Sequence, residues 1–273
     1  MEQLVETEIV ESLAQYVSVW GLLVSEFATA DVSDRSGVSI RWADNPFPFW
    51  NAVFLNGELT DPGALQARLK EAADYVRAKR HPGLIYVCED YVSAAAKRAL
   101  PKILSEEGLE AAIPVTGMTS DAFPLQQSSP PFLQIERVTS EAMLREYANI
   151  SCEAYGFPLE SGRTALHESR LWNEDAYAFL GYKNGRAVSG ASVIVHDGYL
   201  YLALVATRPK ARNKGYAEAL VRHALQTAYE ATKISRTILH ATDQGYRVYR
   251  HVGYHPTARF MTYKFRRIPD VKK

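Results

Sequence analysis

The sequence from residue 204 onward reads Leu204-Val205-Ala206-Thr207-Arg208-Pro209-Lys210-Ala211-Arg212-Asn213-Lys214-Gly215-Tyr216-Ala217. Its apolar start predicts a buried strand, and the residues after the basic turn have the apolar spacing of an amphipathic helix. The first N–H groups of a helix lack partners within the helix and lie at the positive end of its dipole. Because Gly215 would let a phosphate approach that backbone, the turn is a candidate anion site. Four basic residues add positive potential: Arg208, Lys210, Arg212 and Lys214. The alternative interpretation is a solvated basic loop.

The segments before this turn predict a three-strand meander. The dipeptides Asn184-Gly185 and Asp197-Gly198 favour tight type I′ hairpin turns, and they separate strands over 178–182, 187–195 and 199–206. The third strand is apolar on both faces, which predicts a central strand covered on both sides. Upstream, Thr139-Ser140-Glu141 is a helix N-cap signal.

The rest of the second half and much of the first half follow a similar order of elements. After the helix we expect a strand, a short helix and a last strand, over 235–240, 245–251 and 257–265. The first half predicts strand, helix, strand, helix and strand over 51–55, 64–78, 84–89, 92–105 and 109–115. The similarity lies in the pattern and not in residue identity, and it suggests an internal duplication.

The proline-bracketed, uncharged segment 124–131 predicts a linker. We therefore expect an α/β (α+β) fold with a mixed sheet flanked by helices, in two units over 1–125 and 132–273.

Composition excludes several classes of protein. The 273 residues include 31 Lys and Arg and 31 Asp and Glu, so the formal net charge is zero, which argues against nucleic acid or an anionic membrane as partner. Two cysteines are too few for a disulfide framework or a thiolate zinc site. His251 and His255 have helical ligand spacing, but Gly253 interrupts it, and we expect no metal. The acidic N-terminus does not resemble a signal peptide, and we expect a cytoplasmic protein.

Two motifs carry a resemblance to a known family. Arg212-Asn213-Lys214-Gly215-Tyr216-Ala217 resembles the pyrophosphate loop of the GNAT acetyltransferase superfamily, Arg/Gln-x-x-Gly-x-Gly/Ala. Tyr249-Arg250-His251-Val252-Gly253-Tyr254 is similar to a second family element, Tyr-x-x-x-Gly-Phe/Tyr. The resemblance covers about residues 132–267 and extends to the first half as a degenerate copy. It implies an N-acetyltransferase that binds acetyl-CoA and a small-molecule or peptide amine, which attacks the thioester directly in a ternary complex.

The resemblance also implies roles for individual residues. Tyr249 stands where the family commonly protonates the leaving thiolate, either as a hydrogen-bond donor or with a lowered pKa. The alternative for Tyr249 is packing of a short helix. Thr242 replaces the usual Asn near the cofactor. The segment around Glu153, Tyr155 and Phe157 would shape the acceptor cleft, with Glu153 either holding a cationic substrate or solvated. The expected cofactor-binding residues are Val205, Ala206, Thr207, Arg212, Asn213, Lys214, Gly215, Tyr216, Ala217 and Thr242.

The general base is missing from its expected place. Family members often have a Glu in the central strand where this chain has Tyr201, which would line the acceptor channel. Deprotonating a lysine-like amine at pH 7 costs about 4.6 kcal/mol, and an α-amine only about 1 kcal/mol. We therefore expect either an acceptor amine of low pKa or a water relay. The alternative function is a non-catalytic acyl-CoA-binding or sensor protein.

The first half has acidic residues at the matching turn. Asp61 before Pro62 is a good helix cap, and Glu58 adds like charge, so a pyrophosphate would be repelled. We therefore expect this half to be a structural or substrate-shaping relic. Its aromatic cluster is either core packing or the wall of a cleft between the halves: Trp42, Phe47, Phe49 and Trp50.

Overall fold

The computed structural model describes residues 2–121, 133–167, 172 and 176–266. We call residues up to 121 the first half and those from 133 the second half. The first half contains α1 (Glu2–Val24), β1 (Asp31–Arg35), β2 (Val38–Trp42), η1 (Pro48–Trp50), β3 (Asn51–Leu55), α2 (Pro62–Arg77), β4 (Leu84–Cys88), η2 (Glu89–Tyr91), α3 (Ala94–Glu107) and β5 (Leu109–Ser120). The second half contains β6 (Gln134–Arg137), α4 (Glu141–Tyr155), α5 (Leu159–His167), β7 (Ala176–Lys183), β8 (Arg186–His196), β9 (Tyr199–Thr207), η4 (Pro209–Ala211), α6 (Tyr216–Thr232), β10 (Thr237–Thr242), α7 (Asp243–Val252) and β11 (His255–Phe265).

The strands of the described residues form one mixed sheet, in the order β1-β2-β3-β4-β11-β5-β10-β9-β8-β7-β6. Two neighbouring pairs are parallel, β3 with β4 and β9 with β10, and each pair is connected through a helix, α2 or α6. The other neighbours are antiparallel. The mixed sheet flanked by helices agrees with the expected fold class.

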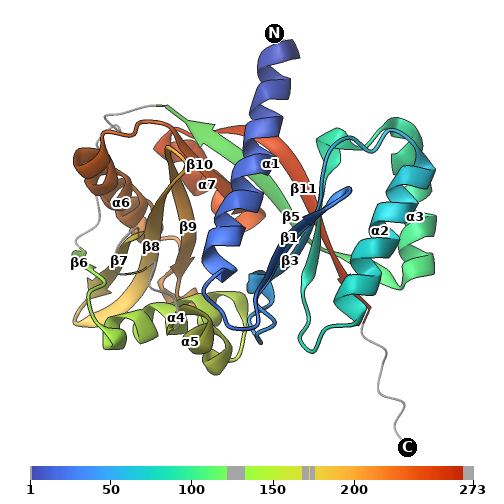
Figure 1. The fold of residues 1–273 in the computed structure, drawn as a ribbon. Coiled ribbons are helices and arrows are strands. Elements are labelled where there is room, and N and C mark those ends of the chain that lie inside the picture. The colour runs from blue at the N-terminus through green and yellow to red at the C-terminus, as the bar shows by residue number, and fades with distance from the viewer. Residues whose placement is uncertain (1, 122–132, 168–171, 173–175, 267–273) are drawn as a thin grey trace, which may run out of the picture.

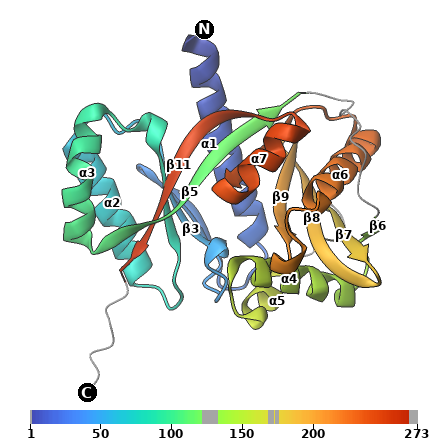
Figure 2. The ribbon, with the colours of Figure 1, turned by 180° about the vertical axis from the view of Figure 1, so that it is seen from behind.

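The last strand of each half lies between two strands of the other half. β5 of the first half pairs with β10 of the second, and β11 of the second half pairs with β4 of the first. β5 and β11 also pair with each other along most of their length. The two halves therefore share one sheet, and Figures 1 and 2 show β5 and β11 running side by side across the middle of the molecule. The division into units at 125 and 132 stays a prediction.

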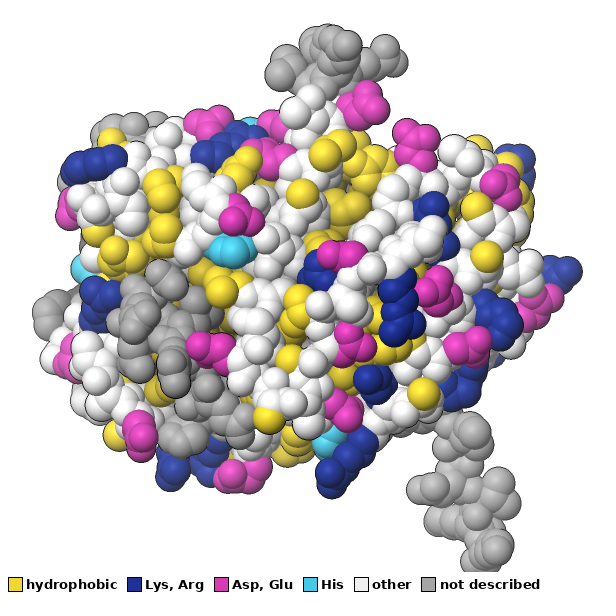
Figure 3. All heavy atoms as spheres, viewed as in Figure 1, with side chains coloured by type: hydrophobic (Ala, Val, Ile, Leu, Met, Phe, Trp, Pro, Cys, Tyr) yellow, Lys and Arg dark blue, Asp and Glu magenta, His cyan; other side chains and the backbone are white. Residues whose placement is uncertain are grey.

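Helices cover the sheet on both faces. α2 and α3 pack on strands of the first half, and α6 packs on β7, β8 and β9. Figures 1 and 2 show α1 on one face of the central strands and α7 on the other. α1 contacts β2 of the first half and β10 and β11 of the second, so it crosses the boundary between the halves. Figure 3 shows acidic and basic side chains interspersed on the face that α1 crosses.

Locally encoded elements agree with the sequence predictions. The hairpin residues Asn184 and Asp197 have φ of 52° and 47°, as type I′ turns require, and each is followed by a glycine with positive φ. Ser140 caps α4 by accepting a hydrogen bond from the Met143 N–H at 3.3 Å. β9 is covered by α6 on one side and α4 on the other, as its apolar sequence predicted. The expected linker 124–131 lies outside the described residues.

Four parts of the fold were not predicted from the sequence: α1, the β1–β2 hairpin, α5 and β6. α1 lacks a clear apolar stripe because the polar residues Ser12 and Gln15 are buried on its covered face, whereas the apolar Val10 is exposed. Its neighbours on β5, β10 and β11 are distant in sequence.

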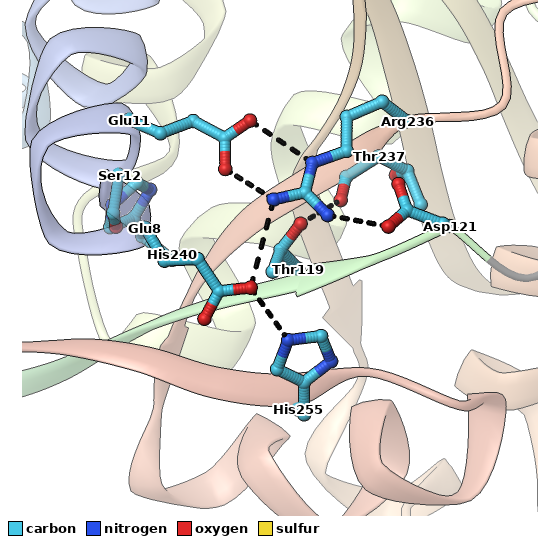
Figure 4. Close-up of polar contacts among 9 residues, drawn as sticks. All are labelled: Glu8, Glu11, Ser12, Thr119, Asp121, Arg236, Thr237, His240 and His255. Carbon is cyan, nitrogen blue, oxygen red and sulfur yellow. Dashed lines mark hydrogen bonds and ion pairs between the residues drawn. The ribbon is translucent and has the colours of Figure 1, made fainter. Parts of the chain in front are cut away.

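A cluster of charged side chains attaches α1 to the exchanged strands. Arg236, just before β10, donates through Nε to Glu11 of α1 at 3.0 Å, and its Nη2 also bonds Glu11. Its Nη1 donates to Asp121, just after β5, at 2.8 Å. Glu8 lies 3.8 Å from Arg236 Nη2 and 3.1 Å from His255 Nε2 (Figure 4). Arg236 therefore lies between three carboxylates of the first half, two from α1 and one from the residue that follows β5.

We expect Arg236→Met to lower the free energy of unfolding by about 1–2 kcal/mol, since it removes charged hydrogen bonds and leaves three carboxylates together, and partial exposure limits the loss. Lys70→Met is the matched control, because the Lys70–Asp74 pair is well exposed and exposed pairs contribute less than about 1 kcal/mol. Urea unfolding at low ionic strength measures both. Equal losses of unfolding free energy in the two variants would show that Arg236 stabilises the protein no more than an exposed ion pair does.

Candidate active site

The described structure contains a cavity of about 300 Å³ where β9 and β10 separate. The two strands pair only at Thr237–Leu200, Ile238–Tyr201 and Leu239–Leu202 and diverge beyond these residues. Beyond the divergence, the cavity is lined by the end of β9, the turn and first residues of α6, and α7. Residues of α1, η1, β4 and β5 form the opposite wall, so both halves build the cavity.

β9 is irregular where it meets the cavity. Its pairing with β8 shifts register between Gly190 and Ser192, so that two residues, Leu204 and Val205, stand opposite one. Leu204 has a φ of 52°, which is the left-handed region that a leucine rarely adopts. Its carbonyl accepts a hydrogen bond from the Tyr147 hydroxyl at 2.8 Å. A bulge leaves one residue outside the strand ladder. The backbone at Leu204 and Val205 is therefore not fully paired with β8 where it lines the cavity.

The N-terminus of α6 has no side-chain cap. Asn213 and Gly215 have φ of 61° and 75°, and Gly215 is the N-cap residue. Among the described residues, no side chain caps the first N–H groups of α6. In α2, by contrast, the Asp61 carboxylate accepts from the Ala64 N–H at 2.9 Å. The two helices start at matching places in their halves, but only α6 has free N–H groups that open into a cavity.

The positive charge near this turn differs from what the sequence suggested. Arg208 is buried and forms ion pairs with Glu146, at 2.6 Å, and with Glu153. Its charge is therefore compensated inside the protein and is not available to a phosphate. Arg212 lines the cavity and donates to the Ala154 carbonyl at 2.8 Å.

The structure brings most of the expected site residues to this cavity. Those that line it are Tyr155, Tyr201, Val205, Ala206, Thr207, Arg212, Asn213, Gly215, Tyr216, Ala217, Thr242 and Tyr249. Lys214, Glu153 and Phe157 are not among the lining residues. Glu153 has Arg208 as its partner, which leaves no free carboxylate there for a cationic substrate. Phe157 packs against Phe47 and Phe49.

Tyr249 is buried in α7 and faces the cavity. Burial raises the pKa of Tyr249 well above its ordinary value, so a lowered pKa is not the way in which this phenol would act. Its hydroxyl has no hydrogen-bond partner among the described residues and is free to donate to a ligand. Gly245 allows the ring its position, since a Cβ there would lie 2.7 Å from Tyr249 Cε2.

Aromatic residues of the first half form the wall opposite β9. Of the cluster noted in the sequence, Phe47, Phe49 and Trp50 line the cavity, whereas Trp42 packs in the core against Tyr75. Both interpretations of that cluster therefore hold, for different members. Three more aromatic residues of the first half line the cavity and were not predicted from the sequence: Tyr16, Trp20 and Tyr86.

His240 of β10 also lines the cavity and was not predicted from the sequence. Its Nδ1 lies 2.7 Å from the Tyr201 hydroxyl, and its Nε2 lies 3.1 Å from Ser12 Oγ of α1. Burial lowers the pKa of His240 well below its ordinary value, so the ring is neutral at pH 7. A histidine inside the otherwise uncharged strand Thr237-Ile-Leu-His-Ala-Thr242 was the available signal.

The described residues contain no group of three or more His, Cys, Asp or Glu side chains arranged to hold a metal. None of the helices in this part of the chain combines the length and the apolar character that crossing a membrane requires.

Comparisons with known proteins agree with this geometry. Residues 144–254 match the model of the acetyltransferase (GNAT) family. No curated protein matches the chain in sequence. A GCN5-related N-acetyltransferase from Kribbella flavida has a similar structure, with a TM-score of 0.68 and 18% identity, over 94% of this chain and 96% of that chain.

Two other solved structures are also similar over most of the chain. A functionally unknown conserved protein from Staphylococcus epidermidis has a TM-score of 0.62 and 11% identity, over 89% of this chain and 96% of that chain. A tandem GNAT protein from the clavulanic acid biosynthesis pathway has a TM-score of 0.53 and 11% identity, over 93% of this chain and 94% of that chain. Residues 144–254 therefore match an acetyltransferase (GNAT) family domain, in a chain whose overall fold is shared with GNAT proteins.

Proposed function

We propose that the protein is an N-acetyltransferase that binds acetyl-CoA at the cavity and transfers the acetyl group to a primary amine of a small molecule or peptide. The observation that carries this proposal is the uncapped start of α6 opening into the space between β9 and β10. Free N–H groups at the positive end of a helix dipole bind phosphate groups. The family match of residues 144–254 supports the same assignment.

The residues at the cavity fit acetyl-CoA. Gly215, Tyr216 and Ala217 would bind the pyrophosphate through backbone N–H groups. The backbone at the β9 bulge, around Leu204 and Val205, would bind the pantetheine arm and the acyl carbonyl. When bound, acetyl-CoA supplies the acyl thioester that the amine attacks. The Tyr249 hydroxyl would donate a hydrogen bond to the sulfur as the thioester bond breaks.

The wall that would face the acceptor favours a neutral amine. Glu218 is the one acidic residue among the described lining residues, and it pairs with Arg222 at 2.9 Å near the start of α6. The acceptor side carries aromatic rings instead. Without a carboxylate, an ammonium ion loses hydration there and gains no ion pair. An amine of low pKa suits this wall, because deprotonating it at pH 7 costs about 1 kcal/mol or less.

The same lack of a carboxylate base keeps a second function open, a non-catalytic sensor of acyl-CoA. The two functions differ in chemistry and not in binding. We expect the protein to release free thiol from acetyl-CoA in the presence of an amine panel that includes weakly basic amines. Tight CoA binding with no thiol release across the panel would favour the sensor.

Cofactor binding is tested by a negative charge at the start of α6. We expect Ala217→Asp to weaken CoA binding by roughly tenfold or more, measured by calorimetry, because the carboxylate would compete with the pyrophosphate for the helix dipole. Ala217→Asn is the control of matched size without charge. The charged variant should be at least as stable to heat in the absence of CoA. Equal affinities for the two variants would contradict phosphate binding at this turn.

The role of Tyr249 is tested by Tyr249→Phe. We expect turnover to fall roughly tenfold or more, because the sulfur loses its hydrogen-bond donor, while the affinity for CoA stays unchanged. Steady-state thiol release and calorimetry measure the two effects. Unchanged turnover would show that Tyr249 only packs α7.

A further inference from the structure

Two side chains at the acceptor end of the cavity form a hydrogen-bonded pair. Tyr201 lies on β9 and His240 on β10, and the Tyr201 hydroxyl is 2.7 Å from His240 Nδ1. Both residues line the cavity. Tyr201 occupies the strand position at which the expected carboxylate base is missing, so the pair stands where a proton acceptor is needed.

The other side of the imidazole has a partner of its own. Nε2 lies 3.1 Å from Ser12 Oγ, a hydroxyl that can accept a hydrogen bond from a ring N–H. Of the two neutral tautomers, the one with its hydrogen on Nε2 leaves Nδ1 to accept the hydrogen bond that Tyr201 donates. This tautomer is the one that can take up a proton from Tyr201.

The surroundings hold the ring in place. Tyr16 of α1 stacks on His240 with ring centroids 3.6 Å apart and planes 17° apart. Gly117 of β5 makes room for Ser12, since a Cβ at residue 117 would clash with Ser12 Oγ. The imidazole is thus oriented by α1 and β5, two elements of the first half.

The groups around the pair are mostly neutral. The titratable side chains that face it are phenols from four elements: Tyr16 of α1, Tyr86 of β4, Tyr155 of α4 and Tyr249 of α7. The neighbouring carboxylates of α1, Glu8 and Glu11, are paired with Arg236. No carboxylate among the described residues accepts a hydrogen bond from Tyr201 or His240, so the pair itself is the available acceptor.

Resting on the acetyl transfer proposed above, we propose that Tyr201 and His240 together accept the proton that the attacking amine loses. As the N–C bond forms and the C–S bond breaks, the amine proton passes to Tyr201 Oη, and the Tyr201 proton passes to His240 Nδ1. The electron pair of the C–S bond goes to sulfur, which Tyr249 holds by a hydrogen bond. The imidazolium then returns its proton through Tyr201, and sulfur is protonated to the free thiol.

The decisive variant is His240→Asn. An Asn side-chain oxygen can accept the Tyr201 hydrogen bond in place of Nδ1, but it does not take up the proton. We expect thiol release with an arylamine, which is neutral near pH 7, to fall on the order of 100-fold in His240→Asn and in Tyr201→Phe. Tyr254→Phe is the control, because it removes a buried hydroxyl that bonds Thr237 on the same strand and is not among the cavity-lining residues.

A second readout separates proton transfer from packing. In the wild type, turnover per neutral arylamine, after correction for protonation of the amine itself, should fall at acidic pH as His240 becomes protonated, and His240→Asn should remove this acidic limb. CoA affinity, measured by calorimetry, should stay within about threefold of wild type in all variants. Side-chain ¹⁵N NMR should show His240 Nδ1 without a proton in the resting protein.

The outcomes distinguish this inference from the function on which it rests. Wild-type turnover retained within about threefold in His240→Asn, or a proton on Nδ1 in the NMR spectrum, would overturn the relay and leave acetyl transfer standing. No thiol release by the wild type with any amine would overturn acetyl transfer and the relay with it.

Discussion

The exchange of β5 and β11 is the constraint on which the rest of the structure depends. β5 lies between β11 and β10, and β11 lies between β4 and β5, so each parallel pair of strands is completed by a strand from the other half. α1 crosses the same region and is held by Arg236. The cavity takes one wall from β9 and α6 and the other from α1, η1 and β4. Loss of the exchange would therefore remove the cavity as well as the sheet.

Local irregularity at the cavity is compensated by specific hydrogen bonds. A non-glycine residue in the left-handed region, such as Leu204, costs about 1–2 kcal/mol. The carbonyls around the bulge are nevertheless satisfied, since Tyr147 donates to Leu204, Ser192 to Ala203 and Ser189 to Ala206, at 2.8, 2.9 and 2.9 Å. Buried backbone can leave the strand ladder only when such partners are present. The side chains thus stabilise an open strand edge that a ligand can use.

The sequence predicted what is encoded locally and missed what depends on distant contacts. The turns at Asn184 and Asp197 and the uncapped start of α6 follow from residues within a few positions. The pairing of Arg208 with Glu146 and Glu153 joins residues about 60 positions apart. Because of it, Arg208 is not available to a phosphate, contrary to what the sequence of the turn suggested. His240 became a candidate only when the fold placed it beside Tyr201 and Ser12. Neither Ser12 nor Tyr16 could be linked to that site while α1 itself was unrecognised.

The two halves have a similar order of elements but different charges at the turn before the first crossover helix, α2 or α6. In the first half, Asp61 caps α2, and Arg68 donates to the Asn56 and Glu58 carbonyls, so a cation and a carboxylate already occupy the turn that corresponds to the start of α6. That half instead contributes aromatic side chains to the wall opposite β9. A wall of neutral rings would raise the free energy both of an ammonium ion and of a carboxylate. The polar side chains that the resting cavity does contain on this side, Tyr201 and His240, are neutral and hydrogen-bonded to each other.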